Sequence, residues 1–469
     1  MSSYLQTIAY FFRLPLRIQW RTFLVQLPRY VPLSILHITS PKGPQPFIIA
    51  LPSRKAHTIP IYVFVPPAPV DLGHDDHPEN EDDEWKVPVV LDFHGGGFIM
   101  GSPLEQAPYC AMMSRELGAV VISVSYRIGP FNQFPSAIHD GEDVLSAILD
   151  TAGVSKGGKV LKKEIQRYYS LMREASSRKG GGTSHLSMKS KITLDPTRLC
   201  ISGFSAGGNL ALNLAISVPA LTQDLSHPAA PVGPTDSSAG LLSPPALPMP
   251  RTETVLDDPT NPWPCILPPV EAQPRLIPLL LFYPSLDARL LPHERPSKPL
   301  PNALHGNEAT PGADGKPAKP KVPGLFSIMS PTYLPKRLRA HPRASPGLCD
   351  PSQDIQKNAA IFLVLPEKDT LAVQSDVWVN KMNEHGWTGP VRFGDDRDHD
   401  LRQEVEHVSR VRNLGNGGLE VWHAPGCRHG WTQFPILRKH EKSERDLVFA
   451  RTLDFVKENW KVVLGRDAV

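Results

Sequence analysis

Cysteine is scarce in this chain, and the few that occur are far apart. The 469 residues contain five cysteines, none of which forms a C-x-x-C pair, at positions 110, 200, 265, 349 and 427. An odd, scattered set is typical of reduced thiols in an intracellular compartment and argues against a disulfide framework or a zinc site. We therefore expect an intracellular protein without a structural metal.

We expect neither a membrane span nor a secretory signal in the amino-terminal residues. The uncharged run, Met1–Phe12, is too short to cross a bilayer, and no cleavage site of small residues follows a positive region. The expected location is therefore cytoplasmic or peripheral to an internal membrane. The 50 basic residues nearly balance the 47 acidic ones, and no basic stripe carries interleaved aromatics, so no nucleic-acid partner is expected.

Acidic residues are absent from the first 70 positions, which contain seven Lys or Arg. Between residues 4 and 27, Arg13, Arg17 and Arg21 recur every fourth position among apolar residues, a pattern that predicts a basic amphipathic helix interrupted or kinked at Pro15. Two interpretations are compatible: a cap that covers the site of the protein, or an interfacial contact with a membrane. By contrast, the acid- and histidine-rich run at 71–84 predicts a solvated loop.

A glycine-flanked serine is the most informative feature that is present. Residues 199–215 read LCISGFSAGGNLALNLA, which predicts a strand, a sharp turn at Ser205 and a helix. Gly203 and Gly207 fit the G-x-S-x-G pattern, in which a strained turn leaves no room for side chains two residues either side of the serine. Such a turn exposes the hydroxyl at the head of a helix, whose N–H groups favour developing negative charge.

A second glycine-rich stretch follows an earlier apolar strand. Residues 87–93 predict a buried strand, and His94, Gly95, Gly96 and Gly97 come directly after it. Three consecutive glycines allow backbone N–H groups to turn towards a pocket. A phosphate cradle is disfavoured, because neither a Lys-Ser/Thr ending nor a G-x-G-x-x-G pattern is present.

An acid and a histidine complete the constellation downstream. Asp369 follows the apolar run 359–365, and His429 lies in a glycine-flanked loop after the run 419–424, so the chain order is Ser, Asp, His. Alternatives exist for both. They are the carboxylates Asp395, Asp396, Asp398 and Asp400, none of which follows a strand, and the histidines His94, His399 and His423.

These motifs together resemble the hormone-sensitive-lipase branch of the α/β-hydrolases. The matching stretches are HGGGF (94–98), SYRIGP (125–130), GFSAGGN (203–209), DTL (369–371) and HGW (429–431). The resemblance implies an ester-cleaving serine enzyme with no cofactor, with Gly96, Gly97 and Ala206 as donors of an oxyanion hole. Position 131, where the family usually has an acidic residue, is a phenylalanine, which leaves the packing of that loop open.

The rest of the chain predicts an α/β domain. Alternating strands and helices indicate a mostly parallel sheet with helices on both faces. Residues 1–58 are expected to be the amphipathic cap segment, and 59–463 the catalytic domain, in which a cap also draws on insertions at about 151–193, 219–274, 288–357 and 391–418. The first insertion has helical spacing over residues 160–176 and a glycine-rich end, and we expect it to be a surface excursion. Residues 302–322 are expected to be disordered.

The predicted chemistry is acyl transfer through a covalent intermediate on Ser205, with His429 as base and Asp369 as its orienting acid. The aromatic residues of the cap and the apolar amino-terminal segment favour a lipophilic ester or an acyl lipid as substrate. Two alternatives remain open: transfer of the acyl group to an acceptor other than water, and a non-catalytic protein that binds small molecules on the same fold. The sequence does not indicate an oligomeric state.

Overall fold

The computed structural model describes residues 2–67, 84–179, 189–219, 262–269, 272, 275–296, 322–394, 417–433 and 438–462. Several sequence predictions concern residues outside these ranges: most of the acidic run at 71–84, the proline-rich run at 302–322 and the alternatives Asp395, Asp396, Asp398, His399 and Asp400. Within the described ranges, none of the helices is long and apolar enough to cross a membrane.

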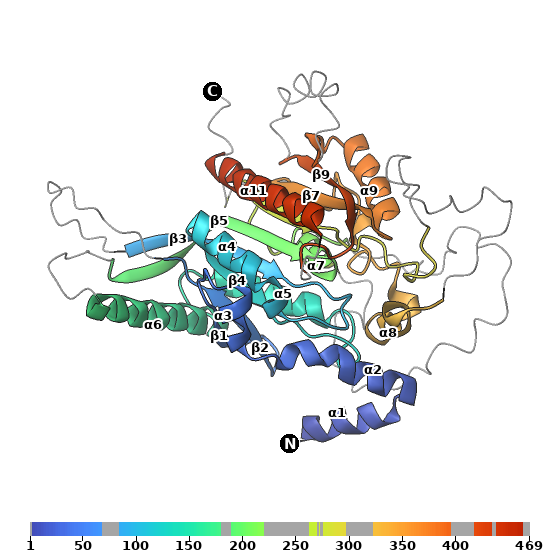
Figure 1. Cartoon of the computed structure of the whole chain (residues 1–469), viewed down its shortest axis with the longest axis horizontal. Coiled ribbons are helices and arrows are strands. Elements are labelled where there is room, and N and C mark those ends of the chain that lie inside the picture. Colours follow the sequence, from blue (N-terminus) through green and yellow to red (C-terminus); the bar gives the residue numbers. More distant parts are fainter. Residues whose placement is uncertain are drawn as a thin grey trace.

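The described strands form one sheet of nine, in the order β1-β2-β4-β3-β5-β6-β7-β9-β8 (Figure 1). The pairs β1·β2 and β2·β4 are antiparallel, and all other neighbours are parallel. The strands are β1 (Phe47–Pro52), β2 (Thr58–Phe64), β3 (Glu84–Phe93), β4 (Val120–Val124), β5 (Lys191–Phe204), β6 (Ile277–Phe282), β7 (Ala359–Lys368), β8 (Val391–Phe393) and β9 (Leu419–Arg428).

Helices cover both faces of this sheet. One face carries α3 (Leu36–Thr39), α4 (Ala107–Leu117) and α11 (Lys439–Lys461), and the other carries α5 (Ser136–Leu149), α6 (Lys156–Lys179), α7 (Ala206–Asn213) and α9 (Ala372–Glu384). Outside these layers lie α1 (Ser2–Arg13), α2 (Leu16–Gln26) and α8 (Leu325–Tyr333), where α2 packs on α8 and α1 extends away from the sheet (Figure 1). This arrangement confirms the predicted fold class.

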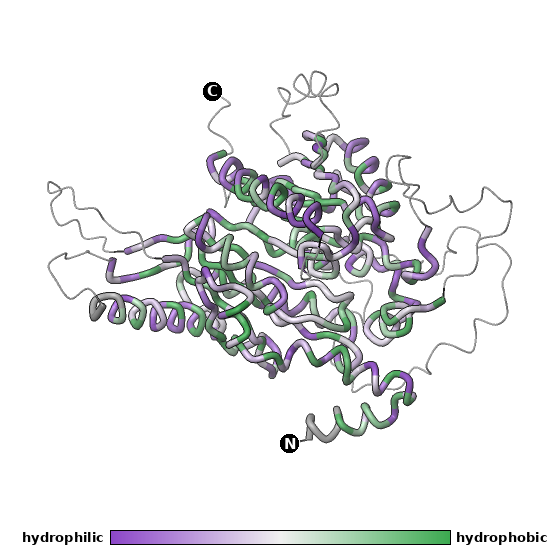
Figure 2. The backbone as a smooth tube through the Cα atoms, viewed as in Figure 1, coloured by the Kyte–Doolittle hydropathy of each residue, from purple (hydrophilic) through white to green (hydrophobic). Residues whose placement is uncertain are grey.

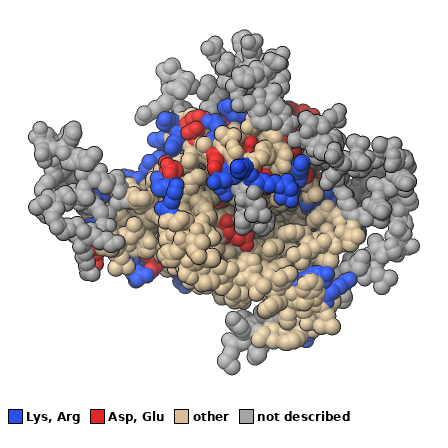
Figure 3. Space-filling model, in the orientation of Figure 1, with Lys and Arg blue, Asp and Glu red and all other residues tan. Residues whose placement is uncertain are grey.

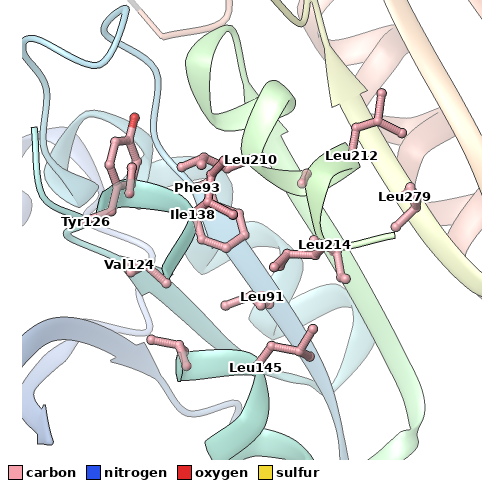
Figure 4. Close-up of a cluster of buried hydrophobic side chains, with 14 of the residues drawn as sticks. Leu91, Phe93, Val124, Tyr126, Ile138, Leu145, Leu210, Leu212, Leu214 and Leu279 are labelled. Carbon is pink, nitrogen blue, oxygen red and sulfur yellow. The ribbon is translucent and has the colours of Figure 1, made fainter. Parts of the chain in front are cut away.

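The core follows from the period-two alternation of the strands. In β3, Val89, Leu91 and Phe93 face the helices α5 and α7, whereas Val90 faces α4 and α11. Figure 4 shows the first of these two clusters, in which Leu91 and Phe93 lie near Ile138 of α5 and Leu210 of α7. A core on each face fixes the sheet rigidly, so that the loops at its carboxyl edge start from defined positions.

Most predicted elements are confirmed, with two corrections. The helix at the amino terminus is interrupted at Pro15, as expected, between α1 and α2. The segment 151–193 is more than a surface excursion, because α6 buries Leu161, Ile165 and Tyr169 in the core. The segment 391–418 begins with the short edge strand β8, which pairs with β9.

Candidate active site

The turn after β5 is shaped by contact between backbones. Ser205 has φ 55° and ψ −111°, in the left-handed region that L-residues rarely adopt. A Cβ atom at Gly203 would lie 2.1 Å from the carbonyl oxygen of Gly207, and one at Gly207 would lie 2.0 Å from that of Phe93. Only glycine fits these two positions, because the atoms it meets belong to backbone and cannot rotate away. The predicted elbow therefore has a direct steric cause.

Ser205, Asp369 and His429 each follow the last residue of a strand, β5, β7 and β9 respectively. The carboxyl ends of parallel strands share one edge of the sheet, so the three side chains meet there. His429 Nε2 lies 2.9 Å from Ser205 Oγ, and His429 Nδ1 lies 2.8 Å from Asp369 Oδ2. Asp369 is buried, and its other oxygen accepts a hydrogen bond from the Leu371 N–H at 2.9 Å.

Tyr283 holds the imidazole of His429 from the side. Its ring meets that of His429 edge to face, with 4.9 Å between centroids, and its hydroxyl lies 2.5 Å from Thr432 Oγ1. Burial raises the pKa of Tyr283 far above its usual value, so the phenol stays neutral. No motif in the sequence marked this tyrosine as a neighbour of the histidine.

The structure places the alternative histidines elsewhere. His423 lies in β9 and stacks on Phe393 of β8, with ring centroids 4.7 Å apart. His94 is fully buried; its Nδ1–H donates to the Gly95 carbonyl at 2.7 Å, and its ring stacks on Tyr126 at 4.2 Å. Burial, reinforced by the charge of Arg29, lowers the pKa of His94 to about 3, so this imidazole is neutral near pH 7.

The loop 94–101, which follows β3, is held in a folded-back conformation. Gly96 has φ 115° and Gly97 has φ 61°, and a Cβ at Gly96 would lie 2.1 Å from the Met100 carbonyl oxygen. The Ile99 and Met100 N–H groups both donate to the Gly96 carbonyl at 3.1 Å. The shape of this loop therefore requires glycine at positions 96 and 97.

Arg29, far away in sequence, anchors the end of the same loop. It lies in the short 3-10 helix after α2, and its guanidinium donates to the carbonyls of Gly101 at 3.1 Å and Tyr126 at 2.7 Å. The Tyr126 hydroxyl in turn donates to the His94 carbonyl at 2.7 Å. Sequence reasoning missed this contact, because a carbonyl acceptor leaves no signature in residue types.

Helix α8 covers the loop from outside. A Cβ at Gly97 would lie 2.8 Å from the ring of Phe326, and Tyr333 stacks on Phe98 with 4.6 Å between centroids. Phe131, at the position where an acidic residue was expected, lies 6.4 Å from Phe11 of α1 between ring centroids. Aromatic side chains thus connect α8 to this loop, and α1 to the neighbouring loop that holds Phe131.

No arrangement in the described ranges offers three His, Cys, Asp or Glu side chains placed to hold a metal ion. The hydrogen-bonded set of hydroxyl, imidazole and carboxylate can carry proton transfer to and from a serine nucleophile without one.

Sequence comparison links part of the chain to known proteins. Residues 90–248 match a family model described as the alpha/beta hydrolase fold. Two relatives from Arabidopsis thaliana are probable carboxylesterase 11, 31% identical over 27% of this chain and 28% of the relative, and probable carboxylesterase 8, 30% identical over 37% and 49%. The chain thus matches less than half the length of these relatives.

Solved structures with a similar chain path include a bacterial heroin esterase, with a TM-score of 0.46 and 16% identity over 97% of both chains. Another is EstE1, a carboxylesterase from a metagenomic library, with a TM-score of 0.45 and 17% identity over 92% of this chain and 96% of that one. The sheet order, the elbow after β5 and the match over residues 90–248 lead to one assignment. The chain has the α/β-hydrolase fold, and part of its sequence is similar to carboxylesterases.

Proposed function

We propose that this protein is a serine carboxylic-ester hydrolase with Ser205 as nucleophile, His429 as general base and Asp369 as the orienting acid. The observation that carries the proposal is the continuous hydrogen-bonded chain from Ser205 Oγ through His429 to Asp369. Its members lie at the ends of three parallel strands, where rigid elements fix them.

The geometry supports acyl transfer in two steps. His429 Nε2 takes the proton of Ser205 as Oγ attacks the ester carbonyl, and the buried Asp369 stabilises the imidazolium that forms. The imidazolium then gives this proton to the departing alcohol, leaving an acyl-serine. Water, deprotonated by the same imidazole, attacks the acyl carbon and releases the carboxylic acid and free serine.

The carbonyl oxygen gains its charge only during attack, so it needs donors that are already in place. We assign this role to the backbone N–H groups of Gly96, Gly97 and Ala206, the last at the start of α7. The positive φ of both glycines and the helix N-terminus behind Ser205 support the assignment. His94, held neutral by burial, orders the loop and takes no proton from the substrate.

A lipophilic ester is the substrate class that these surroundings favour. Phe326, Phe98 and Tyr333 pack around the loop that would bind the carbonyl oxygen, and aromatic walls favour apolar acyl or alcohol groups. We also propose an intracellular location, cytoplasmic or at the surface of an internal membrane, which five free cysteines, four of them buried, support.

Covalent labelling tests the proposal. A fluorophosphonate should label the purified wild-type chain and Ser352→Ala, which changes a half-buried serine away from the site, but not Ser205→Ala. A series of nitrophenyl esters of increasing acyl length should then be hydrolysed, most efficiently when the acyl chain is long. An unlabelled wild type would favour a non-catalytic binding protein, and esters of an added alcohol among the products would favour an acyltransferase.

A further inference from the structure

Helix α2 has two apolar faces, and only one is packed against the protein. Successive residues rotate by 100° around a helix, so Ile18, Thr22 and Val25 share one face, and all three are buried. The opposite face carries Leu16, Trp20 and Phe23, which are 80%, 55% and 69% exposed. A solvated helix normally has polar side chains on its second face. The outer face of α2 is therefore unusual for a solvent-exposed helix face, because it is apolar.

Exposed apolar side chains are concentrated in this part of the molecule. Of the 21 large hydrophobic residues exposed in the described ranges, 12 lie between positions 8 and 38. A groove of about 510 Å³ runs along α2, lined by Gln19 and otherwise by apolar residues, namely Phe11, Leu16, Trp20, Phe23 and Leu24. Figure 2 shows the hydrophobic residues of α1 and α2 at the edge of the molecule, away from the sheet. Contiguous exposed patches of this kind mark interaction sites.

Arginines border this surface, and no acidic residue lies near it in sequence. Arg13 and Arg17 are exposed, and the Arg21 guanidinium lies 4.5 Å from the centroid of the Trp20 ring. The first 70 residues contain no Asp or Glu. In Figure 3, blue side chains adjoin tan surface at the end of the molecule that holds these helices. The surface therefore combines an apolar face with positive charge alone.

From this combination we infer that the outer face of α1–α2 docks on an anionic lipid surface. Aromatic and leucine side chains on one side and arginines beside them are the pattern of interfacial helices, which place the apolar side chains below the headgroups. A second copy of this chain is a poor occupant, because two identical faces would bring their arginines together with no carboxylate between them. An acidic protein helix could offer charge but not the extended apolar layer.

Docking here would face the candidate active site towards the lipid. Helix α2 packs on α8, and α8 places Phe326 against Gly97 of the loop 94–101. Two packed helices, α2 itself and α8, each about 10 Å across, separate the docking face from that loop. This step rests on the proposed ester hydrolysis: an ester dissolved in the lipid could reach Ser205 without crossing much water.

Vesicle flotation of the full chain tests the inference. Wild type should float with vesicles of phosphatidylcholine containing about 30% phosphatidylserine and much less with phosphatidylcholine alone. Trp20→Glu/Phe23→Glu should lower binding at least about tenfold, whereas Val154→Glu/Val377→Glu, which changes two exposed apolar residues on other helices and loops, should bind like wild type. Brominated lipid should quench the fluorescence of Trp20, and Trp20→Phe should lose that part of the quenching.

Charge is tested separately. Arg13→Gln/Arg17→Gln should weaken binding to the anionic vesicles by about fivefold per arginine, and Lys159→Gln/Lys163→Gln on α6 should leave it unchanged. Wild type that does not float, or a Trp20→Glu/Phe23→Glu variant that floats as well as wild type, would overturn the inference. The inference would also be overturned if wild type does not float but forms a dimer, and the Trp20→Glu/Phe23→Glu variant is a monomer.

The same variants separate this inference from the proposed function. Trp20→Glu/Phe23→Glu should hydrolyse a water-soluble nitrophenyl acetate at the wild-type rate, because neither side chain belongs to the catalytic set. A chain that floats but hydrolyses no ester would refute the hydrolase and keep the docking surface. A chain that hydrolyses esters but never floats would do the reverse.

Discussion

Two glycine-rich turns form this site, and they are held in different ways. The elbow around Ser205 is fixed by backbone contacts with its own strand, helix and the neighbouring strand β3. The loop 94–101 depends on side chains from elsewhere, including Arg29, which lies 72 positions before Gly101, and Phe326 of α8. The position of Ser205, the proposed nucleophile, is thus set by the sheet, whereas the loop assigned to the oxyanion depends on the amino-terminal segment and α8.

The substitution with the largest expected effect leaves both turns intact and tests the proposed triad. Asp369→Asn should lower kcat by about 10⁴, because an amide can donate to His429 Nδ1 and so favour the wrong tautomer. Steady-state hydrolysis of a nitrophenyl ester measures it. Asp446→Asn, an exposed acid on α11, is the matched control and should retain wild-type kcat. A fall below tenfold in Asp369→Asn would mean that the triad is wrongly assigned.

Next in size is a change that breaks the elbow alone. Gly207→Ala should lower the free energy of unfolding by about 3 kcal/mol or more, because its Cβ would lie 2.0 Å from the Phe93 carbonyl oxygen and 2.6 Å from that of His94. Gly324→Ala is the control, since its added methyl group meets no atom within 4 Å. Urea denaturation of both variants gives the comparison, and equal stabilities would show that the elbow can open without cost.

A smaller effect isolates the distant support of the other turn. Arg29→Ala should lower kcat about tenfold with little change in KM, less than the 10² to 10³ of a lost oxyanion donor, because the donors remain but are less well held. The affinity for a trifluoromethyl ketone, whose adduct places an oxyanion there, should fall by the same factor. Arg198→Ala, which also removes a bond to a carbonyl, that of Lys86, should change neither. If Arg29 has a purely structural role, Arg29→Ala would lower the free energy of unfolding and leave the affinity for the ketone unchanged.

The smallest effect concerns a carboxyl group just beyond the loop. Burial raises the pKa of Glu105 to about 7 from 4.5. A carboxyl with a raised pKa binds its proton more tightly in the folded state. The contribution of Glu105 to the free energy of unfolding is therefore greatest below about pH 4.5 and falls as pH rises to 7. Glu105→Gln should remove about 1–2 kcal/mol of this fall, discounted for partial exposure. Denaturation at pH 5 and pH 8 measures it, with exposed Glu116→Gln as control; parallel changes in both variants would contradict it.

The difference between the turns also explains what sequence could predict. Gly203, Ser205 and Gly207 make a local pattern, and the apolar runs before Ser205, Asp369 and His429 marked the three strands that bring them together. Arg29 and Tyr283 act through partners far away in sequence, so their roles needed the folded chain. Their importance could not be inferred from residue type, because arginine and tyrosine serve many purposes.

Strands at the sheet edges were equally hard to foresee. The strand β1 is half exposed and ends in proline, and β8 has three residues with little burial, so neither shows the apolar run that marks a central strand. The segment that contains α6 is rich in lysine, which obscured the buried stripe of Leu161, Ile165 and Tyr169. The composition thus reflected the exposed face of this helix and not its buried face.

The unusual backbone of Ser205 has one further consequence. Glycine adopts φ 55° without the steric cost that serine bears, which is of order 1–3 kcal/mol for such a conformation. A Ser205→Gly chain should therefore melt at a higher temperature than the native one while losing its reactive hydroxyl. Durability and reactivity oppose each other at this single residue.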